Sequence, residues 1–449
     1  MAEVDSKIFR AYDIRGLYPS EVNKKAAFLI GRALGDFLGA RKVVVGRGVR
    51  FSSKKLSKKL IKGLLEQGVN VIDIGLVSTP VLFWRVFKEG IDAGIIVTAS
   101  HNPIEYNGFK ILKANGEMIG VDTGFKEIQE IIKKNNFKNI ARKGEYSQEQ
   151  GAIEKYVQEI IKSFPDFERL KKFRIAVDAA GGPGGLVMNS FFKHLESELF
   201  ALEFKLDPYL RHEPNPLILE TIQDLKKTIQ IKKCDFGFAL DGDADRVIIL
   251  DERGEFVPPD LVIALLAKEI LKENPGAKIA YDHRSSKAVP ERIKEMGGIP
   301  VKMPVGSAII KRRMKKEKII FGGETSGHYL FQETFYAESP LFVILHVLKI
   351  LTEENEPLSE VMKRIQKYFK SNELNFELRD KEKVFAAVKE RYNDAQISFF
   401  DGITIEYPDW WFNLRPSRTE PLLRLNLEAK EKGLFEEKLE EVKNLITSA

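Results

Sequence analysis

The stretch Lys42-Val43-Val44-Val45 has the composition of a buried β-strand, and an amphipathic helical pattern follows it over residues 53–67. The same arrangement recurs at Arg174-Ile175-Ala176-Val177 and at Lys278-Ile279-Ala280-Tyr281, and each of the three runs opens with a basic residue. Alternating strands and helices are typical of α/β domains. The recurrence therefore predicts three related, mixed α/β domains.

A second apolar strand in each unit runs into a loop that is rich in glycine or aspartate. We expect these strands over residues 95–97, 236–240 and 319–321. Such sheets bind ligands beyond the carboxyl ends of their strands, so the loops should face one central cleft. Beyond residue 370, shorter alternating strands and a charged helix over residues 430–446 predict a smaller α+β domain. The predicted domains are residues 1–150, 151–254, 255–368 and 369–449.

The bulk composition excludes several classes of protein. The chain has 449 residues, of which 43% are hydrophobic and 30% charged, as in globular proteins with more than one core. Its longest apolar runs are far shorter than a membrane-spanning helix, and its start does not resemble a secretory signal, so we expect a cytoplasmic protein with no membrane partner. The single cysteine, Cys234, follows a helical pattern next to an apolar strand, so we expect a buried side chain.

The net charge of +6 comes largely from lysine clusters at helical spacing. The sequence contains no zinc-finger or RNA-recognition signature and no basic stripe interleaved with aromatic residues. A nucleic-acid partner is therefore not expected. An anionic small substrate fits the modest positive charge better.

The first loop is Thr98-Ala99-Ser100-His101-Asn102-Pro103. A serine at a strand end, beside a histidine and before a turn fixed by proline, is placed as an exposed nucleophile. A serine that caps a helix or closes a turn is the alternative, which this loop alone leaves open.

The second loop, Asp241-Gly242-Asp243-Ala244-Asp245-Arg246, lies between two apolar stretches. Three carboxylates on alternate residues repel one another unless a cation neutralises them, and Mg²⁺ is the hard, oxygen-liganded ion that fits. A solvated acidic turn would not need aspartate at every second position, and an EF-hand would need glycine where Arg246 stands. We therefore interpret the loop as a magnesium site. A phosphorylated Ser100 would complete it, while Arg246 would stabilise charge on the phosphoryl oxygens.

Two further loops offer groups for a sugar and for a phosphate. In Gly322-Gly323-Glu324-Thr325-Ser326-Gly327-His328, Glu324 and Ser326 suit sugar hydroxyls, although a glycine-rich turn with a capping serine fits nearly as well. In Arg415-Pro416-Ser417-Arg418-Thr419-Glu420-Pro421, two guanidinium groups and two hydroxyls could cradle a phosphate, and an ordinary basic turn is the alternative.

Basic residues outside these loops add to the candidate site. Arg10 and Arg15 are placed where an anionic substrate could meet them, although arginines near the start of a chain are often only surface charge. Lys110, in Tyr106-Asn107-Gly108-Phe109-Lys110, follows the serine loop closely enough to fold back onto it.

Four loops in this order and in these contexts resemble the α-D-phosphohexomutase family, and the resemblance covers essentially the whole chain. The run from Tyr106 to Lys110 and the loop from Gly322 to His328 look most like the phosphomannomutase/phosphoglucomutase members. The resemblance implies four domains around a central cleft, with one fold shared by the first three. It also implies Mg²⁺ as cofactor and an isomerase that moves phosphate between C6 and C1 of a hexose through phosphoserine and a hexose 1,6-bisphosphate. A monomer and a homodimer are both compatible with it.

The resemblance also implies a role for each matching residue. Ser100 would carry the phosphoryl group and would bind Mg²⁺ together with Asp241, Asp243 and Asp245. Glu324 and Ser326 would bind sugar hydroxyls, and Arg246 belongs to the substrate-binding set. The phosphate that is not reacting would be bound by Arg415, Ser417 and Thr419, and Arg418, which stands where the family often has asparagine or glycine, would tighten that binding. Five further residues match positions that contribute to the site and would share proton transfer: Arg10, Arg15, His101, Lys110 and His328.

The chain departs from the family pattern at several positions. Arg284, a further substrate-binding candidate, stands where a lysine often occurs, and Ser307 replaces a histidine that some bifunctional members use near the sugar. Two rival activities stay open: a phosphoglucosamine mutase, because one contact at C2 decides the preferred sugar, and a sugar phosphatase that uses the same serine and metal.

Overall fold

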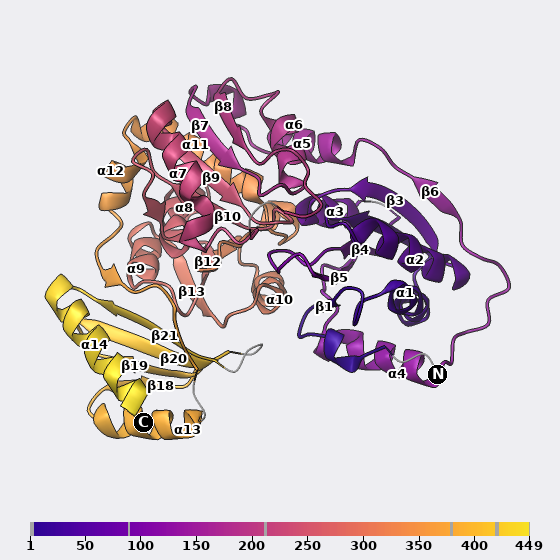
Figure 1. The fold of residues 1–449 in the computed structure, drawn as a ribbon. Coiled ribbons are helices and arrows are strands. Elements are labelled where there is room, and N and C mark those ends of the chain that lie inside the picture. The colour runs from indigo at the N-terminus through magenta and orange to yellow at the C-terminus, as the bar shows by residue number, and fades with distance from the viewer. Residues whose placement is uncertain (1–3, 89, 211–212, 378–379, 418–421, 449) are drawn as a thin grey trace.

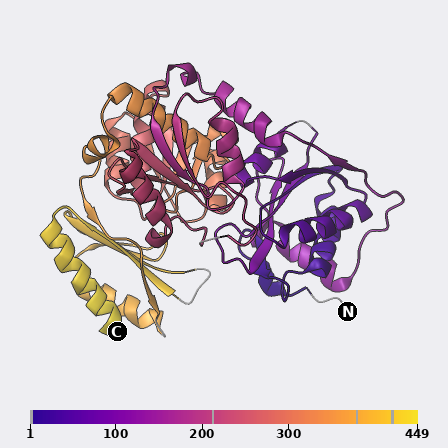
Figure 2. The ribbon, with the colours of Figure 1, turned by 45° about the horizontal axis from the view of Figure 1, so that its top comes forward.

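The computed structural model describes residues 4–88, 90–210, 213–377, 380–417 and 422–448. Four β-sheets follow one another along the chain, and we call the parts built on them domains I to IV. Figures 1 and 2 show domain I and domain IV at opposite ends of the molecule, with domains II and III between them.

Domain I has a six-stranded sheet in the order β1-β5-β4-β2-β3-β6. The predicted strand β2 (Lys42–Arg47) lies at its centre, parallel to both β3 (Asn70–Leu76) and β4 (Ala93–Val97), and β5 (Tyr106–Lys113) runs antiparallel to β4. Its other elements are β1 (Ile14–Leu17), β6 (Tyr146–Gln148), α1 (Lys24–Leu38), α2 (Ser53–Glu66), α3 (Thr79–Val86) and α4 (Lys126–Lys134).

Domain II repeats this pattern in a sheet of order β11-β10-β9-β7-β8. The central strand β7 (Arg174–Asp178) is parallel to β8 (Glu198–Leu202) and β9 (Phe236–Leu240), and β10 (Val247–Leu250) is antiparallel to β9. Its other elements are α5 (Ala152–Lys162), α6 (Gly184–Phe191), α7 (Gln223–Lys232) and β11 (Phe256–Val257). Cys234 is buried, as predicted.

Domain III repeats the pattern again in the order β13-β12-β14-β15. The central strand β12 (Lys278–Asp282) is parallel to β13 (Ile299–Met303) and β14 (Phe321–Gly323), and β15 (Tyr329–Phe331) is antiparallel to β14. Its helices are α8 (Pro259–Glu273), α9 (Ala288–Glu295), α10 (Ser307–Glu317), α11 (Pro340–Glu354) and α12 (Leu358–Lys363). The shared order of two parallel neighbours and one antiparallel strand confirms the prediction of three related domains.

One predicted strand boundary in domain III is wrong. The strand expected over residues 319–321 begins at Phe321 and includes Gly322 and Gly323, whose composition predicts a loop. The glycines stay in the sheet because α8 packs directly onto them: a Cβ on Gly323 would lie 2.6 Å from the side chain of Ile263.

Domain IV is the smaller α+β domain that the sequence predicts. Its strands are ordered β16-β21-β20-β19-β18, with β17 also paired to β21, and their register is antiparallel throughout. Its elements are β16 (Phe369–Lys370), β17 (Leu374–Glu377), α13 (Lys381–Arg391), β18 (Gln396–Ser398), β19 (Ile403–Glu406), β20 (Trp410–Pro416), β21 (Leu422–Ala429) and α14 (Lys432–Ser448). Short helices elsewhere in the chain are η1 (Ser6–Ile8), η2 (Val121–Phe125), η3 (Phe167–Arg169), η4 (Leu219–Ile222) and η5 (Gln332–Thr334).

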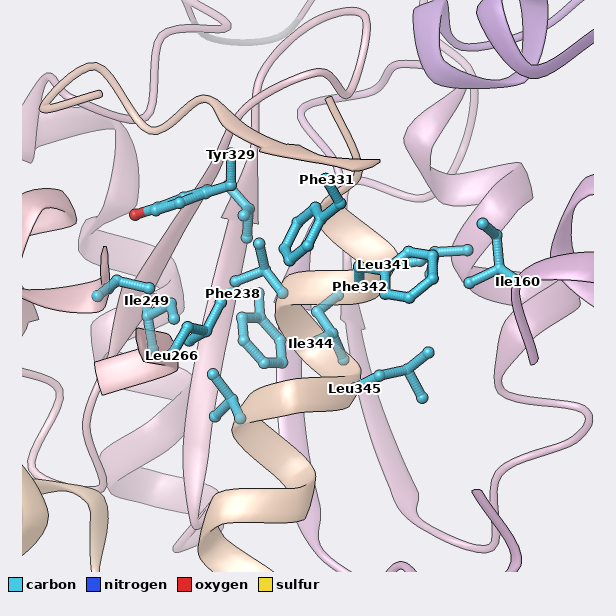
Figure 3. Close-up of a cluster of buried hydrophobic side chains, with 14 of the residues drawn as sticks. Ile160, Phe238, Ile249, Leu266, Tyr329, Phe331, Leu341, Phe342, Ile344 and Leu345 are labelled. Atoms are coloured by element: carbon cyan, nitrogen blue, oxygen red, sulfur yellow. The ribbon is translucent and has the colours of Figure 1, made fainter. Parts of the chain in front are cut away.

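One continuous hydrophobic core joins domains I, II and III. It includes Leu82 of α3, Phe238 of β9 and Phe342 of α11. In Figure 3 the side chains of α11, among them Phe342 and Leu345, lie together with Phe238 and with Ile160 of α5. Domain IV has a separate core between its sheet and its two helices. The first three domains are therefore packed as one body, to which domain IV is attached.

Polar contacts line the seam between domains III and IV. The Nζ of Lys370 lies 2.5 Å from Asp260 Oδ2, and the backbone N–H of Lys287 donates to Glu428 Oε1 over 2.9 Å.

The predicted domain boundaries stay predictions. Strand β11 lies just beyond the predicted boundary between residues 254 and 255, and it pairs with β10 of domain II. Among the helices of the described ranges, none combines the length and the apolar composition that a bilayer crossing requires.

Candidate active site

The three equivalent loops of domains I, II and III occupy the same place in each sheet, between a parallel strand and the antiparallel strand beside it. The serine loop (residues 98–105) connects β4 to β5, the aspartate loop (residues 241–246) connects β9 to β10, and the glutamate loop (residues 324–328) connects β14 to β15. Because the three domains share one fold and one core, these loops meet in space.

Ser100 lies in contact with the aspartate loop. Its Oγ donates a hydrogen bond to Asp241 Oδ2 over 2.7 Å and lies 3.2 Å from His101 Nδ1. The predicted exposure of Ser100 is wrong, since only 3% of the residue is accessible. It is buried because the two loops touch through their backbones: a Cβ on Gly242 would lie 2.6 Å from the carbonyl oxygen of Ser100.

The three aspartates converge, as their alternate spacing predicts. Asp241, Asp243 and Asp245 are buried, and one carboxylate oxygen of each lies within 4.8 Å of the others. The loop turns back on itself at Ala244, which has a φ of +55°. Asp241 Oδ1 accepts hydrogen bonds from the backbone N–H groups of Asp245 over 3.0 Å and of Arg246 over 3.1 Å. These bonds fix the loop with its carboxylates pointing to one place.

Lys110, which we expect to fold back onto the serine loop, contacts the aspartate cluster beside it. Its Nζ lies 2.8 Å from Asp243 Oδ2 and 2.6 Å from Asp245 Oδ2. Although burial disfavours the charge, the two carboxylates raise the pKa of Lys110 above its ordinary value. Lys110 is therefore a fixed cation beside the aspartates.

The residues before Lys110 explain its position on β5. Asn107 is completely buried, and its Nδ2 donates to the hydroxyls of Ser52 over 2.7 Å and of Ser53 over 3.0 Å, where α2 begins. Gly108 lies against β1: a Cβ there would be 1.8 Å from the carbonyl oxygen of Ile14. The run from Tyr106 to Lys110 thus ties β5 to its neighbours and directs the lysine to the aspartate loop.

The aspartate cluster fits a hard divalent cation. Asp243 Oδ1 is buried and has no hydrogen-bond partner within the part of the chain that the structure describes, and the buried Asp245 Oδ1 lies 3.5 Å from His328 Nε2. Burial, together with Asp245 and Asp243, raises the pKa of Asp241 well above its ordinary value. Buried carboxylate oxygens without donors are costly unless a cation meets them, and Mg²⁺ prefers such ligands.

Two histidines near the aspartates have opposite charge preferences. Burial, together with Arg246 and Arg15, lowers the pKa of His101 well below its ordinary value. His328 lies with Nδ1 3.4 Å from Glu324 Oε2 and Nε2 3.5 Å from Asp245 Oδ1. Burial opposes its charge, but these two carboxylates raise the pKa of His328 to about 9. At neutral pH the site therefore holds one neutral and one protonated imidazole, which suits acid–base chemistry.

The other candidates of domains I to III are also placed. Arg15 donates to Asn102 of the serine loop and to Asp13, whereas Arg10 is exposed. Arg246 Nε lies 3.3 Å from His328 Nε2, and Ser326 Oγ lies 2.9 Å from His328 Nδ1. Glu324 Oε1 accepts from the backbone N–H of Gly306 over 2.9 Å. All of these except Arg10 are joined directly to the serine, aspartate or glutamate loop.

A second cationic centre lies between domains III and IV. Arg415 of β20 stands opposite Arg424 of β21, and like charges at such positions repel. Glu373 offsets part of this repulsion: its carboxylate accepts from Arg415 Nη2 over 3.1 Å, from Arg424 Nη1 over 3.1 Å and from Arg284 Nη1 over 3.2 Å. We call these three arginines and Glu373 the arginine cluster. Although burial disfavours its charge, the three guanidinium groups lower the pKa of Glu373 to about 2.

The arginine cluster is tied to the glutamate loop through Asp282. Arg284 donates to Asp282 from Nε over 3.1 Å and from Nη2 over 2.9 Å. The same carboxylate accepts from the backbone N–H of Thr325 over 2.7 Å. Arg415 Nε is buried and has no hydrogen-bond partner among the described residues. Ser417 follows β20, while Arg418 and Thr419 lie outside the described residues.

Replacing Glu373 by glutamine should lower the free energy of unfolding by about 1–3 kcal/mol at pH 7, because Arg415 is nearly fully buried and loses its counter-charge. The pKa of Glu373 is depressed, so its contribution is complete above pH 4.5 and is lost as the pH falls toward 2. The difference between wild type and variant in urea unfolding should therefore shrink at pH 3. Glu377→Gln, an exposed carboxylate on β17, is the control and should change stability by less than about 0.5 kcal/mol. An equal loss in both variants would contradict the prediction.

Sequence reasoning missed three contributors to the site. Arg50 holds the serine loop, Thr79 Oγ1 donates to Asp243 Oδ2 over 2.8 Å, and Glu373 organises the arginine cluster. None lies in a loop with an unusual composition. Arg50 and Thr79 each stand near the carboxyl end of a domain I strand, which was the only available signal.

The fold and the geometry of the site are typical of enzymes that transfer phosphoryl groups: a serine hydroxyl next to a carboxylate cluster that suits a metal, and a separate arginine cluster that suits a second phosphate. Models of the phosphoglucomutase/phosphomannomutase family match the chain in four consecutive parts. Alpha/beta/alpha domains I, II and III match residues 6–139, 154–254 and 258–368, and the C-terminal domain matches residues 373–445.

Individual relatives agree with these matches over nearly the whole length. The chain is 38% identical to a phosphomannomutase of Methanocaldococcus jannaschii and 37% identical to one of Vibrio cholerae, and each alignment covers 98% of both chains. A crystal structure of a phosphoglucomutase/phosphomannomutase family protein from Burkholderia thailandensis superimposes with a TM-score of 0.90 at 29% identity, covering 99% of this chain and 98% of that one. The chain therefore belongs to the phosphoglucomutase/phosphomannomutase family of hexose phosphate mutases, which are isomerases.

Proposed function

We propose that this enzyme interconverts the 6-phosphates and 1-phosphates of mannose and glucose through a phosphorylated Ser100 and a hexose 1,6-bisphosphate. The observation that carries the proposal is the hydrogen bond from Ser100 Oγ to Asp241, which places a nucleophilic oxygen at the edge of the carboxylate cluster. Family membership supports the reaction, and the relatives named phosphomannomutase support mannose phosphate as a substrate.

We propose that Asp241, Asp243 and Asp245 bind Mg²⁺ together with the phosphoryl group on Ser100. When bound, the ion withdraws electron density from the phosphorus and so assists transfer. Lys110 and Arg246 stand beside the carboxylates and would stabilise charge on the phosphoryl oxygens.

Transfer breaks the bond between Ser100 Oγ and phosphorus and forms a bond from phosphorus to a sugar oxygen. The sugar hydroxyl loses a proton, and the serine oxygen gains one. Neutral His101, with Nδ1 3.2 Å from Ser100 Oγ, is placed to exchange a proton with that oxygen. His328 is protonated and could donate to a substrate oxygen, while Glu324 and Ser326 would bind sugar hydroxyls. Arg15 would keep the serine loop in place, and Arg10 could meet the substrate from solvent.

The arginine cluster would bind the phosphate that is not reacting, through Arg284 and Arg415 with Ser417, Arg418 and Thr419. A bisphosphate that turns over between the two centres would present its other phosphate to Ser100. Domain IV has its own core, so it can move as a unit and close over the substrate, which would keep water from the phosphoserine.

We also propose that the enzyme acts in the cytoplasm, that hexose 1,6-bisphosphate activates it, and that its domains span residues 1–150, 151–254, 255–368 and 369–449.

The test is to follow phosphate by phosphorus NMR after adding mannose 6-phosphate or glucose 6-phosphate, Mg²⁺ and a trace of hexose 1,6-bisphosphate. We expect the 1-phosphate to appear with no free phosphate. Release of inorganic phosphate would identify a phosphatase instead. Turnover of glucosamine phosphate alone would identify a phosphoglucosamine mutase. Omitting the bisphosphate should slow the start of the reaction if the serine is not already phosphorylated.

A further inference from the structure

Arg50 is bonded to the backbone of the serine loop at several points. Its Nη2 donates to the carbonyl oxygens of Ser100 over 2.9 Å and of Asn102, and its Nη1 donates to those of Pro103 over 2.7 Å and of Tyr106 over 3.1 Å. One planar guanidinium group thus spans the chain from Ser100 to the first residue of β5. A lysine could not do the same, because its single ammonium nitrogen cannot meet carbonyls that are spread in this way.

The guanidinium group of Arg50 uses its N–H donors for these backbone carbonyls. Only 4% of the residue is accessible, and no carboxylate of a described residue lies within ion-pair distance of it. Burial lowers the pKa of Arg50 to about 10, with Asp243 as the main opposing influence, so the group is still protonated at neutral pH. A buried arginine without a direct carboxylate partner is unusual and indicates that the backbone it holds is under tight constraint.

The constraint concerns the conformation of Ser100. This residue has a φ of +49°, in the left-handed region that residues other than glycine rarely adopt. In this conformation Oγ reaches Asp241, while the Ser100 carbonyl oxygen lies against Gly242 of the aspartate loop and accepts from Arg50. Without Arg50 that carbonyl would be buried without a charged donor, and the chain would lose the contacts that keep it in this strained form.

We propose that Arg50 is a positioning residue for phosphoryl transfer, which holds the serine loop so that Ser100 Oγ faces the aspartate cluster. The proposal rests on the proposed role of Ser100 as the residue that carries the phosphoryl group. Arg50 lies in the short connection from β2 to α2, where its own carbonyl accepts from the backbone N–H of Ser53 over 2.8 Å at the start of α2. The position of the nucleophile is therefore set by the central strand of domain I.

Steady-state kinetics of Arg50→Lys and Arg50→Ala test the proposal. A displacement of about 1 Å at the nucleophile costs roughly 10²-fold, so we expect kcat to fall by about that factor while KM stays within about threefold. Guanidinium ion added at millimolar concentration should restore part of the kcat of Arg50→Ala but not of Arg50→Lys, whose side chain fills the site. Arg32→Lys is the matched control, since Arg32 is bonded to Gln67 of the same domain, away from the loop. It should keep the wild-type kcat.

Hydrogen exchange of the amides of residues 98–106, without substrate, gives a readout that does not depend on activity. Exchange should be faster in both Arg50 variants than in wild type and in Arg32→Lys. If wild type does not interconvert hexose phosphates, the proposed function fails, but faster exchange would still support the role of Arg50 in holding the loop. An unchanged kcat, an effect on KM alone, or unchanged exchange would overturn the proposal. Should Arg50→Ala not fold, Arg50→Lys, which keeps the charge and the aliphatic chain, carries the test.

Discussion

Replacing Ser100 by alanine is expected to lower the rate of hexose phosphate interconversion by about 10⁴-fold or more, because the variant lacks the oxygen that is proposed to carry the phosphoryl group. Binding of substrate should persist, since the arginine cluster and the glutamate loop are untouched. The rate is measured by phosphorus NMR, and transfer of radioactive phosphate from labelled hexose 1,6-bisphosphate to the protein is measured in parallel. The variant should take up no label.

Ser57→Ala is the matched control for this experiment, because Ser57 is also buried in domain I but donates only to the carbonyl of Lys54 within α2. It should retain both activity and labelling. Turnover or stable labelling in Ser100→Ala would show that another residue accepts the phosphoryl group.

Replacing Lys110 by methionine is expected to lower the free energy of unfolding of the metal-free protein by about 3–5 kcal/mol. The methionine fills a similar volume but leaves Asp243 and Asp245 buried without the cation that now lies 2.8 Å and 2.6 Å from them. Mg²⁺ would then meet three carboxylates with no competing lysine. Adding Mg²⁺ should therefore stabilise Lys110→Met more than it stabilises wild type. Urea unfolding with EDTA and with Mg²⁺ measures both effects.

Lys113→Met is the matched control, because Lys113 lies on the same strand and pairs with Glu117 over 2.9 Å at the partly exposed end of β5. A pair of this kind contributes at most about 1 kcal/mol. The prediction would be contradicted if both methionine variants lost equal stability, or if Mg²⁺ raised the free energy of unfolding of wild type and of Lys110→Met equally. The charge of Lys110 would then not be what stabilises the buried aspartates.

The sequence was sufficient for most of the fold because each repeat carries its own signal. The basic residue that opens each central strand and the apolar run that precedes each loop mark the same strands in three domains. The error at β14 has a local cause. Gly322 and Gly323 have the composition of a loop, and only the packing of α8 against them, through Ile263, keeps them in the sheet. No pattern within those residues reveals that contact.

The candidate site could be predicted where its residues sit in unusual loops, and not where they support those loops from elsewhere. Thr79 contacts Asp243, which is 164 positions away, and Glu373 contacts Arg415, which is 42 positions away. The loop that begins at Arg415 looks strongly cationic in the sequence, but the structure places Glu373 against its first guanidinium group. The expected exposure of Ser100 failed for the same reason, since the aspartate loop that covers it comes from another domain.

The left-handed backbone at Ser100 also bears on why the proposed nucleophile is serine. Threonine carries an equivalent hydroxyl, but a β-branched side chain is strongly disfavoured at a φ of +49° because its second substituent crowds the backbone. Cysteine would fit the backbone but would present a sulfur, which is a poor ligand for Mg²⁺. The dihedral angle of this residue and the ligand preference of Mg²⁺ thus favour serine over both threonine and cysteine at position 100.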